Sequence, residues 1–331
     1  MKSLLFLFSC FHRLGCQLKN LAYDRELLKP KRAPIPVISI GNINFGGTEK
    51  TPLVMELVAF LVKRGLKTAL ISRGYKGAWE RKGGVLSNGK RILGTWKEGG
   101  DEPYLVALRL PQAGIFIGQE RLRSCQKAKE LGFEIAVLDD GFQHRRLYRS
   151  LDIVLYNPAE KIALREPVTS LKRADILLIK KRAEFPEMPK LKRLLSPENI
   201  FEYSVRNAGF SRVETRQMLG EDAFRGKRIL AFCGIARPER FISLLKESGA
   251  DVVFCFKFPD HHPYSEFSLR KIAKKFHELK PEAVVTTEKD TVKIASAKEF
   301  LEEIPAYALR IGLNLEQEFY NRILSFLQTI K

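Results

Sequence analysis

The fold is decided by residues 36–52, which read Pro-Val-Ile-Ser-Ile-Gly-Asn-Ile-Asn-Phe-Gly-Gly-Thr-Glu-Lys-Thr-Pro. The apolar run Val37–Ile40 is typical of a short buried strand, and a helical pattern starts near Thr51 and continues to about residue 64. A glycine-bearing loop lies between them. Strand, loop, Lys-Thr and helix follow one another in the order of a P-loop, whose backbone N–H groups and helix N-terminus bind phosphate. The alternative is an ordinary Gly-rich turn between a strand and a helix.

Within a P-loop, each polar residue has an expected role. Lys50 would contact the β- and γ-phosphates, and the Thr51 hydroxyl would bind Mg²⁺. The backbone of the loop would surround the phosphates through Gly46, Gly47 and Thr48. The stretch therefore predicts a ligand with β- and γ-phosphates, together with Mg²⁺.

Two residues depart from the P-loop pattern G-x-x-x-x-G-K-[ST], since Asn44 and Glu49 stand where it has glycine. Asparagine tolerates positive φ, so the first change is mild. Glu49 adds a side chain and a negative charge where the backbone must approach phosphate. We expect weaker ATP binding, through repulsion or through pairing of Glu49 with Lys50. In the alternative, the side chain swings outward and Gly46 and Gly47 absorb the strain.

A second informative stretch runs from Glu134 to His144. Four apolar residues, Ile135–Leu138, lead into Asp139 and Asp140. This is the pattern of a buried parallel strand that delivers carboxylates to Mg²⁺. Two adjacent aspartates at a strand end are costly unless a cation offsets them. Downstream of a P-loop, the pattern predicts a metal site.

Composition limits the possible partners. The chain has 331 residues, 45% of them hydrophobic, which is enough for one large or two ordinary folded domains. Its net charge of +19 predicts an anionic partner: nucleic acid, an anionic membrane or a phosphorylated substrate. The five cysteines are scattered without a C-x-x-C pair, which argues against disulfides and zinc and favours a reducing cytosol.

The N-terminus resembles a helix that lies on a membrane. Leucine and phenylalanine recur at helical spacing over residues 1–22, and residues 1–32 carry seven Lys/Arg against two Asp/Glu. The apolar run Leu4–Phe8 is too short for a signal peptide and far too short to span a bilayer. A basic amphipathic helix bound to a membrane surface and a helix packed on the protein's own core remain equal alternatives.

A candidate proton acceptor follows the second predicted strand. Asp101 lies in Gly-Asp-Glu-Pro, just before the helical pattern that begins at Tyr104. Capping of this helix would explain the residue structurally. In the functional reading, its carboxylate faces the nucleotide site and accepts a proton.

The remaining sequence predicts a second α/β unit. A polar, proline-containing linker over residues 183–200 marks the boundary, and βαβ spacing resumes near residue 228. Asp260-His261-His262 lies in a polar loop of this unit. Two adjacent histidines without a further ligand do not predict zinc. A histidine bonded to a catalytic carboxylate and a histidine without a role are equal alternatives.

Taken together, the motifs resemble one family, tetraacyldisaccharide 4′-kinase, the lipid A kinase of Gram-negative bacteria. The resemblance covers nearly the whole chain. It is carried, in order, by Gly41-Asn42, Gly46-Gly47-Thr48, Lys50-Thr51-Pro52, Ser72-Arg73-Gly74-Tyr75, Gly100-Asp101-Glu102-Pro103, Leu138 to His144, Leu164-Arg165-Glu166-Pro167, Arg173-Ala174-Asp175 and Phe258-Pro259-Asp260-His261.

The resemblance implies an architecture and an activity. The fold would be α/β: an N-terminal membrane-associating amphipathic helix (1–30), a P-loop NTPase-like kinase domain with a parallel sheet (31–190) and a smaller C-terminal α/β domain (191–331). The enzyme would be a phosphotransferase that uses ATP and Mg²⁺ to phosphorylate the 4′-hydroxyl of a tetraacylated disaccharide 1-phosphate. It would work as a peripheral protein at the cytoplasmic face of the inner membrane, with no nucleic-acid partner and no obligate protein partner.

The resemblance also implies residue roles. Asp101 resembles the family's general base, paired with His261, and Lys50 acts on the phosphates. The metal ligands would be Thr51, Asp139, Asp140 and Glu166. Residues lining the site would be Tyr75, Arg121, Gln143, His144 and Arg165.

Two other function classes compete with this interpretation. A P-loop NTPase of another class, such as a partitioning or metal-delivery protein, would hydrolyse nucleotide without a lipid acceptor. A basic nucleic-acid-binding protein would explain the net charge, but no zinc-finger, RRM or helix-turn-helix signature is present.

Overall fold

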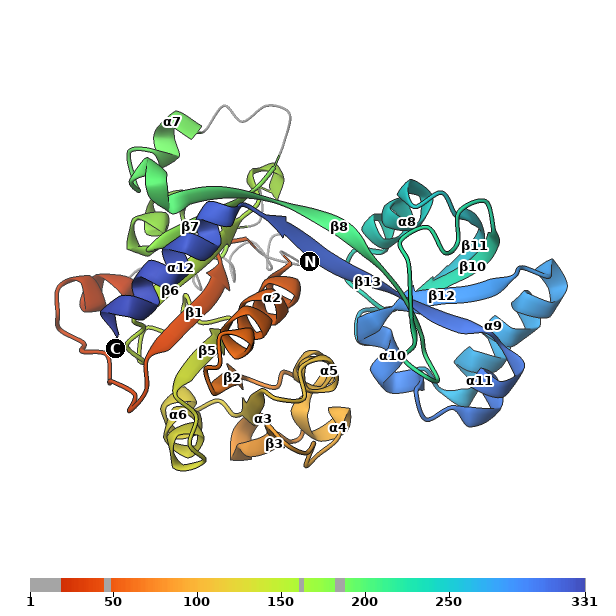
Figure 1. The fold of residues 1–331 in the computed structure, drawn as a ribbon, viewed down its shortest axis with the longest axis horizontal. Helices are drawn as coiled ribbons and strands as arrows, with labels where there is room; N and C mark the ends of the chain where they lie inside the picture. The colour runs from red at the N-terminus through yellow and green to blue at the C-terminus, as the bar shows by residue number, and fades with distance from the viewer. Residues whose placement is uncertain (1–18, 45–48, 161–163, 182–187, 331) are drawn as a thin grey trace, which may run out of the picture.

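The computed structural model describes residues 19–44, 49–160, 164–181 and 188–330. Within these ranges it is an α/β protein of two lobes (Figure 1). One continuous, mostly parallel sheet runs through both, in the order β11-β10-β12-β13-β8-β7-β6-β1-β5-β2-β4-β3, with β9 paired to β8. This confirms the predicted fold class.

The N-lobe contains the P-loop stretch. Its strands are β1 (Val37–Asn42), β2 (Thr68–Ser72), β3 (Gly84–Asn88), β4 (Gly114–Ile117), β5 (Ile135–Asp139), β6 (Leu151–Tyr156) and β7 (Ile176–Lys180). Its helices are α2 (Lys50–Lys63), α3 (Trp79–Lys82), α4 (Trp96–Gly99), α5 (Asp101–Arg109), α6 (Arg121–Glu130) and α7 (Met188–Leu191). The predicted strand and helix on either side of the phosphate loop are confirmed as β1 and α2.

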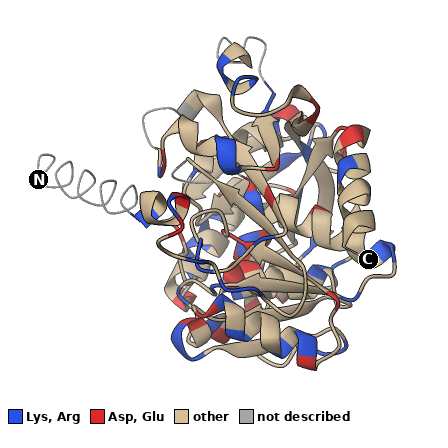
Figure 2. Ribbon diagram, turned by 90° about the vertical axis from the view of Figure 1, so that its left-hand side faces the viewer, with Lys and Arg blue, Asp and Glu red and all other residues tan. Residues whose placement is uncertain are grey.

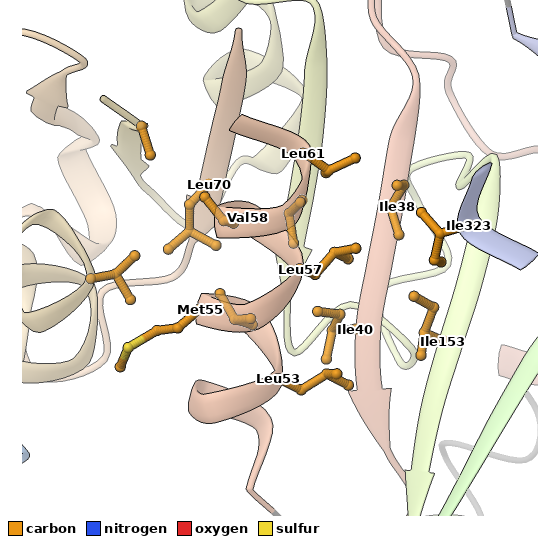
Figure 3. Packing of buried hydrophobic residues seen from close by; sticks show 14 of the residues in the cluster. Ile38, Ile40, Leu53, Met55, Leu57, Val58, Leu61, Leu70, Ile153 and Ile323 are labelled. Carbon is orange, nitrogen blue, oxygen red and sulfur yellow. The ribbon is translucent and has the colours of Figure 1, made fainter. Parts of the chain in front are cut away.

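Packing of α2 on the sheet fixes the position of the phosphate loop. Leu53, Leu57 and Leu61 are fully buried along one side of α2 and face β1 (Figure 3). All six residues of β1 are buried, because β1 is covered on both faces and lies between β5 and β6. Each fully buried leucine contributes about 1.5–3 kcal/mol relative to an exposed one. The start of α2 is therefore held rigidly against the carboxyl end of β1.

The C-lobe is the second α/β unit. Its strands are β10 (Arg228–Cys233), β11 (Asp251–Lys257) and β12 (Ala283–Thr287), and its helices are α8 (Pro238–Glu247), α9 (Glu266–Leu279), α10 (Glu288–Ile294) and α11 (Lys298–Glu303). Two buried clusters lie on its two sheet faces, one beneath α8 and one beneath α9 and α11. The predicted βαβ spacing is confirmed, since β10, β11 and β12 pair in parallel.

Two long strands connect the lobes. β8 (Ile200–Arg212) starts beside β7 in the N-lobe, and β13 (Ala306–Leu315) starts beside β12 in the C-lobe. They pair antiparallel with each other from Tyr203↔Leu315 to Arg212↔Tyr307. Figure 1 shows the two strands crossing together from one lobe to the other. We call this pair the β8–β13 ribbon.

The last helix returns to the N-lobe. α12 (Gln317–Thr329) follows β13 back across, and its Phe319 and Ile323 are fully buried in the core that also holds α2 (Figures 1 and 3). The predicted C-terminal domain 191–331 includes α12, but in the structure this helix packs in the core of the N-lobe. The reason is the direction of β13, which leaves the chain end beside the first lobe.

The predicted N-terminal helix falls only partly on described residues. Residues 1–18 lie outside the described ranges, and residues 19–24 are helical. Beyond it, Leu27 is 75% exposed and Leu28 is 45% exposed. Over the ranges that the structure describes, no helix is long and apolar enough to cross a membrane.

Candidate active site

A cleft of about 850 Å³ lies between the lobes and collects most of the predicted site residues. The N-lobe contributes the ends of β2 and β5 and the starts of α2, α5 and α6. The C-lobe contributes α8, the loop after β11 and the start of α10. Predicted site residues that line the cleft are Lys50, Thr51, Tyr75, Asp101, Arg121, Asp139, Asp140, Gln143, His144, Arg165 and His261.

The phosphate loop is described only at its two ends. Gly46, Gly47 and Thr48, predicted to surround phosphate, lie outside the described residues. Glu49 takes the N-cap position of α2 with φ 55° and ψ 27°, the left-handed conformation that favours glycine. The backbone here therefore has the geometry that the P-loop pattern assigns to glycine.

The Glu49 side chain points away from Lys50. It accepts a hydrogen bond of 3.0 Å from the Tyr203 hydroxyl and lies 3.5 Å from Lys180 Nζ. It also pairs with Arg240 of α8, across the cleft. The structure thus favours the outward alternative over pairing of Glu49 with Lys50.

Lys50 and Thr51 begin α2, where backbone N–H groups and the helix dipole favour anions. Lys50 Nζ lies 2.6 Å from Asp140 Oδ1 and 3.3 Å from Asn42 Oδ1. The Thr51 hydroxyl donates a 2.8 Å hydrogen bond to Glu102 Oε2. Both side chains therefore face the carboxylates at the ends of β5 and the start of α5.

Asp139 and Asp140 end β5, which lies between β1 and β2. Burial, with the nearby charges of Glu102 and Asp140, raises the pKa of Asp139 to about 6. Burial would also raise the pKa of Asp140, but Lys50 and Arg165 outweigh it and lower that pKa to about 2. A buried carboxylate that resists ionisation next to one that is ionised fits a site for a cation.

Arg165 and Gln143 hold the edge of this carboxylate site. Arg165 Nη1 donates to both oxygens of Asp140, at 3.0 Å each. Gln143 Nε2 donates a 2.9 Å bond to the backbone oxygen of Asn42. Gln143 therefore connects the loop after β5 to the end of β1, and Arg165 connects Asp140 to the segment that follows β6.

Arg121, His144 and Tyr75 lie around the same end of the sheet. Arg121 is buried at the start of α6 and donates a 2.5 Å bond to the Gly118 carbonyl. Burial, with the positive charges of Arg121 and Lys19, lowers the pKa of His144 to about 4, so this ring is neutral near pH 7. The Tyr75 ring is exposed and lies edge-on to His261, with 5.8 Å between ring centroids.

Asp101 and His261 come together from opposite lobes. His261 Nδ1 lies 2.9 Å from Asp101 Oδ2, although the two residues are 160 positions apart in the chain. Burial would raise the pKa of Asp101, but hydrogen bonds from His261 and Lys293 outweigh it and lower the pKa to about 2. The structure brings together the pair that the sequence suggested.

One detail of Asp101 differs from the sequence interpretation. The N-cap of α5 is Gly100, at φ 89°, and Asp101 is the first residue of the helix. Its side chain turns to His261 and Lys293, and the helix shows no side-chain cap bond. Capping therefore does not explain this carboxylate.

Glu166 is not brought to the other predicted metal ligands. It is buried, pairs with Arg173 and accepts a 2.8 Å hydrogen bond from Asn20 Nδ2. It is not among the residues that line the cleft. Within the described ranges, no group of three or more His, Cys, Asp or Glu side chains is arranged to hold a metal ion.

Several cleft residues were not predicted. Arg240 and Lys289 line the cleft from α8 and α10, and Tyr203 of β8 bonds Glu49 from beneath it; these elements carried no motif. For Lys289 a signal existed, because it directly follows the carboxyl end of the parallel strand β12. The contact of Arg240 with Glu49 depends on the relative placement of the lobes, and that of Tyr203 depends on the pairing of β8 with β7.

The chain is similar to known proteins over nearly its whole length. A family model described as "Tetraacyldisaccharide-1-P 4′-kinase" matches residues 1–328. A tetraacyldisaccharide 4′-kinase from Syntrophus aciditrophicus is 35% identical over 95% of this chain and 90% of its own length. One from Desulfotalea psychrophila is 34% identical over 93% and 91%.

A solved structure resembles the whole molecule. The crystal structure of LpxK from Aquifex aeolicus in complex with ATP is 29% identical to this chain. The match has a TM-score of 0.79 and covers 99% of this chain and 98% of the other. Because the family model and the relatives cover almost the entire sequence, the chain belongs to the tetraacyldisaccharide-1-phosphate 4′-kinase family.

Proposed function

We propose that this protein transfers the γ-phosphoryl group of ATP to the 4′-hydroxyl of a tetraacyldisaccharide 1-phosphate, a step in lipid A biosynthesis. Family membership supports the reaction and the substrate class. The observation that carries the proposal is the meeting, in one cleft, of Lys50 and Thr51 at a helix N-terminus with the Asp101–His261 pair.

The proposed roles follow from charge and position. Lys50, at the start of α2, would neutralise charge on the transferred phosphoryl group. Asp101, held ionised, would accept the proton of the attacking hydroxyl, and His261 would orient it through the 2.9 Å bond. Arg121, Arg165, Tyr75, Gln143 and His144 would line the nucleotide and phosphate groups.

We propose Mg²⁺ as the metal, held by Thr51, Asp139 and Asp140. A buried carboxylate at a strand end with a raised pKa is a group that a bound cation would stabilise, and the oxygen ligands suit Mg²⁺. When bound, Mg²⁺ would neutralise charge on the β- and γ-phosphates. Glu166 would need to leave Arg173 and Asn20 to join these ligands, so we leave it out of the set.

We further propose peripheral binding to the anionic cytoplasmic face of the inner membrane. Exposed Leu21 lies at the end of the predicted amphipathic segment, and exposed Leu27 and Leu28 follow it. Lysine and arginine surround them at Arg25, Lys29 and Lys31. Elsewhere, Lys and Arg are interspersed with Asp and Glu over many elements (Figure 2), which does not favour a nucleic-acid site.

Phosphate transfer tests the proposal directly. With radiolabelled ATP and the tetraacyldisaccharide 1-phosphate, we expect labelled lipid from the native chain. We expect Asp101→Ala to lower kcat by about 10²–10⁴-fold while ATP affinity changes little. Asp222→Asn, an exposed carboxylate that does not line the cleft, is the matched control. ATP hydrolysis without lipid product, or full turnover in Asp101→Ala, would contradict the proposal.

A further inference from the structure

Two lysines of α10 reach the Asp101–His261 pair from the C-lobe. Lys289 and Lys293 are four residues apart, so they lie on one face of this helix. Val292, between them, is buried in the core of the N-lobe, whereas Ile294 belongs to a core of the C-lobe. α10 is therefore positioned by both lobes at the place where they meet.

Lys293 holds one oxygen of Asp101. Its side chain is 1% exposed, and Nζ lies 2.8 Å from Asp101 Oδ2. Burying an ammonium group costs several kcal/mol unless a carboxylate compensates it. His261 Nδ1 approaches the same oxygen at 2.9 Å. Both donors converge on Oδ2, so the other carboxylate oxygen carries neither of these bonds and remains for an acceptor hydroxyl.

Lys289 holds the far side of the histidine. Its Nζ lies 3.3 Å from His261 Nε2, 3.2 Å from Glu102 Oε1 and 3.5 Å from Asp260 Oδ1. An ammonium group only donates, so Nε2 must accept. The ring proton then sits on Nδ1, where it is donated to Asp101. Lys289 thus selects the tautomer that the Asp101 contact needs.

We propose that Lys289 and Lys293 are positioning residues for phosphoryl transfer, which hold Asp101 ionised and oriented and His261 in its Nδ1–H tautomer. This inference rests on the proposed role of Asp101 as proton acceptor. In this arrangement, α10 of the C-lobe orients a carboxylate that belongs to the N-lobe. The lysines contact the acceptor pair directly, so their effect should appear in the pH dependence of the reaction.

The charged groups around Asp101 determine how its pKa should change when Lys293 is replaced. His261 and Asp260 approach from the loop after β11, Lys289 and Lys293 from α10, and Glu102 from its own helix. Burial raises the pKa of Asp101 and Lys293 lowers it. Removing the Lys293 charge should therefore raise this pKa. In Lys293→Met the fraction of ionised Asp101 should therefore fall toward acid pH, whereas Lys293→Arg retains the charge.

The first test compares pH profiles. The ratio of kcat/KM for Lys293→Met to that for the native chain should fall on the acid side, approaching tenfold per pH unit. The ratio for Lys293→Arg should stay nearly flat. Lys298→Met, an exposed lysine on α11, is the control and should give a flat ratio near one. A ratio for Lys293→Met that is low but flat would show a merely structural role and overturn the assignment to Lys293.

The second test reads the tautomer without turnover. In ¹⁵N-histidine NMR spectra, with the His261 signals assigned by their loss in His261→Asn, the native ring should show a protonated Nδ1. In Lys289→Met we expect rings with a protonated Nε2 to appear, because the ammonium group that excludes this proton is gone. An unchanged tautomer would overturn the assignment to Lys289. If Lys293→Met does not fold, Lys293→Gln, which keeps the length and loses the charge, replaces it in the pH comparison.

Asp101→Asn separates this inference from the proposed function. Retained turnover in Asp101→Asn would show that Asp101 is not the proton acceptor, and it would contradict the proposed mechanism. If Asp101→Asn is inactive but the kcat/KM ratio of Lys293→Met stays flat with pH, the proposed function stands and only the positioning role of Lys293 is contradicted.

Discussion

At the scale of single residues, Glu49 is the clearest departure from the expected chemistry of the phosphate loop. A glutamate adopts φ 55° there, a region that costs a non-glycine residue about 1 kcal/mol or more. Its contacts with Tyr203, Lys180 and Arg240 offset that cost. Glu49 therefore has a strained backbone, but its side chain connects the phosphate loop to the β8–β13 ribbon and to the C-lobe.

We expect Glu49→Gly to bind ATP about two- to tenfold more tightly. A like charge near the triphosphate costs on the order of 1 kcal/mol even in water, which corresponds to about fivefold in affinity. Titration calorimetry on both chains measures the difference. Equal affinities would show that the outward side chain does not affect the phosphates.

Asp101 also makes a prediction about acid stability. Hydrogen bonds from His261 and Lys293 hold the pKa of folded Asp101 at about 2, below its ordinary value of 3.8, so the ionised form stabilises the fold. This contribution is present above about pH 4 and is lost as pH falls through 4 to 2. It amounts to about 2 kcal/mol. Denaturant unfolding at several pH values should show a smaller acid loss for Asp101→Asn than for the native chain, and parallel curves would contradict the shift.

At the scale of elements, the sequence predicted what is local. The phosphate loop, the strand that ends in Asp139 and Asp140, and the βαβ spacing of the C-lobe each occupy a short continuous stretch with its own pattern. The β8–β13 ribbon and α12 were not predicted, because their pairing joins residues about a hundred positions apart. The same holds for Lys293, whose function depends on α10 meeting α5.

Glu166 illustrates the opposite limit. A family motif assigned it to the metal, but its nearest partners here are Arg173 and Asn20. A motif states which residue type occurs at a position in the chain. It does not state which of two charged partners the side chain contacts in a given conformation.

The return of α12 predicts a large effect at the far end of the chain. Phe319 is fully buried, and its ring lies 6.1 Å from that of Phe201 and 5.4 Å from that of Tyr320. We expect Phe319→Ala to destabilise the protein by about 3–5 kcal/mol, because it empties a site in the N-lobe core. Thermal unfolding measures this, with exposed Gln317→Ala as control. A loss below 1 kcal/mol would mean that α12 is not part of that core.

At the scale of the whole molecule, the membrane prediction depends on the N-terminal segment. We expect deletion of residues 1–22 to release the protein from vesicles that contain phosphatidylglycerol. High salt should weaken binding of the full chain, because each basic residue near an anionic surface contributes about 1 kcal/mol. Co-sedimentation measures both effects.

Two comparisons complete that experiment. Leu27→Ser with Leu28→Ser tests the exposed leucines separately, and should weaken binding less than the deletion does. Equal vesicle binding with and without residues 1–22 would instead assign that segment to the protein's own core.

The β8–β13 ribbon has a consequence for the timing of the reaction. Between the lobes, residues 204–207 of β8 pair with 311–314 of β13, and among the described strands only with them. A lone pair of strands twists far more readily than a wide sheet. Separation of the lobes should therefore be a single hinge event that breaks the contacts of Asp101 with His261 and Lys293 together with that of Glu49 with Arg240. Spin labels at exposed Lys129 and Lys298 should then report two discrete distances, whereas one continuous distribution would argue against a common hinge.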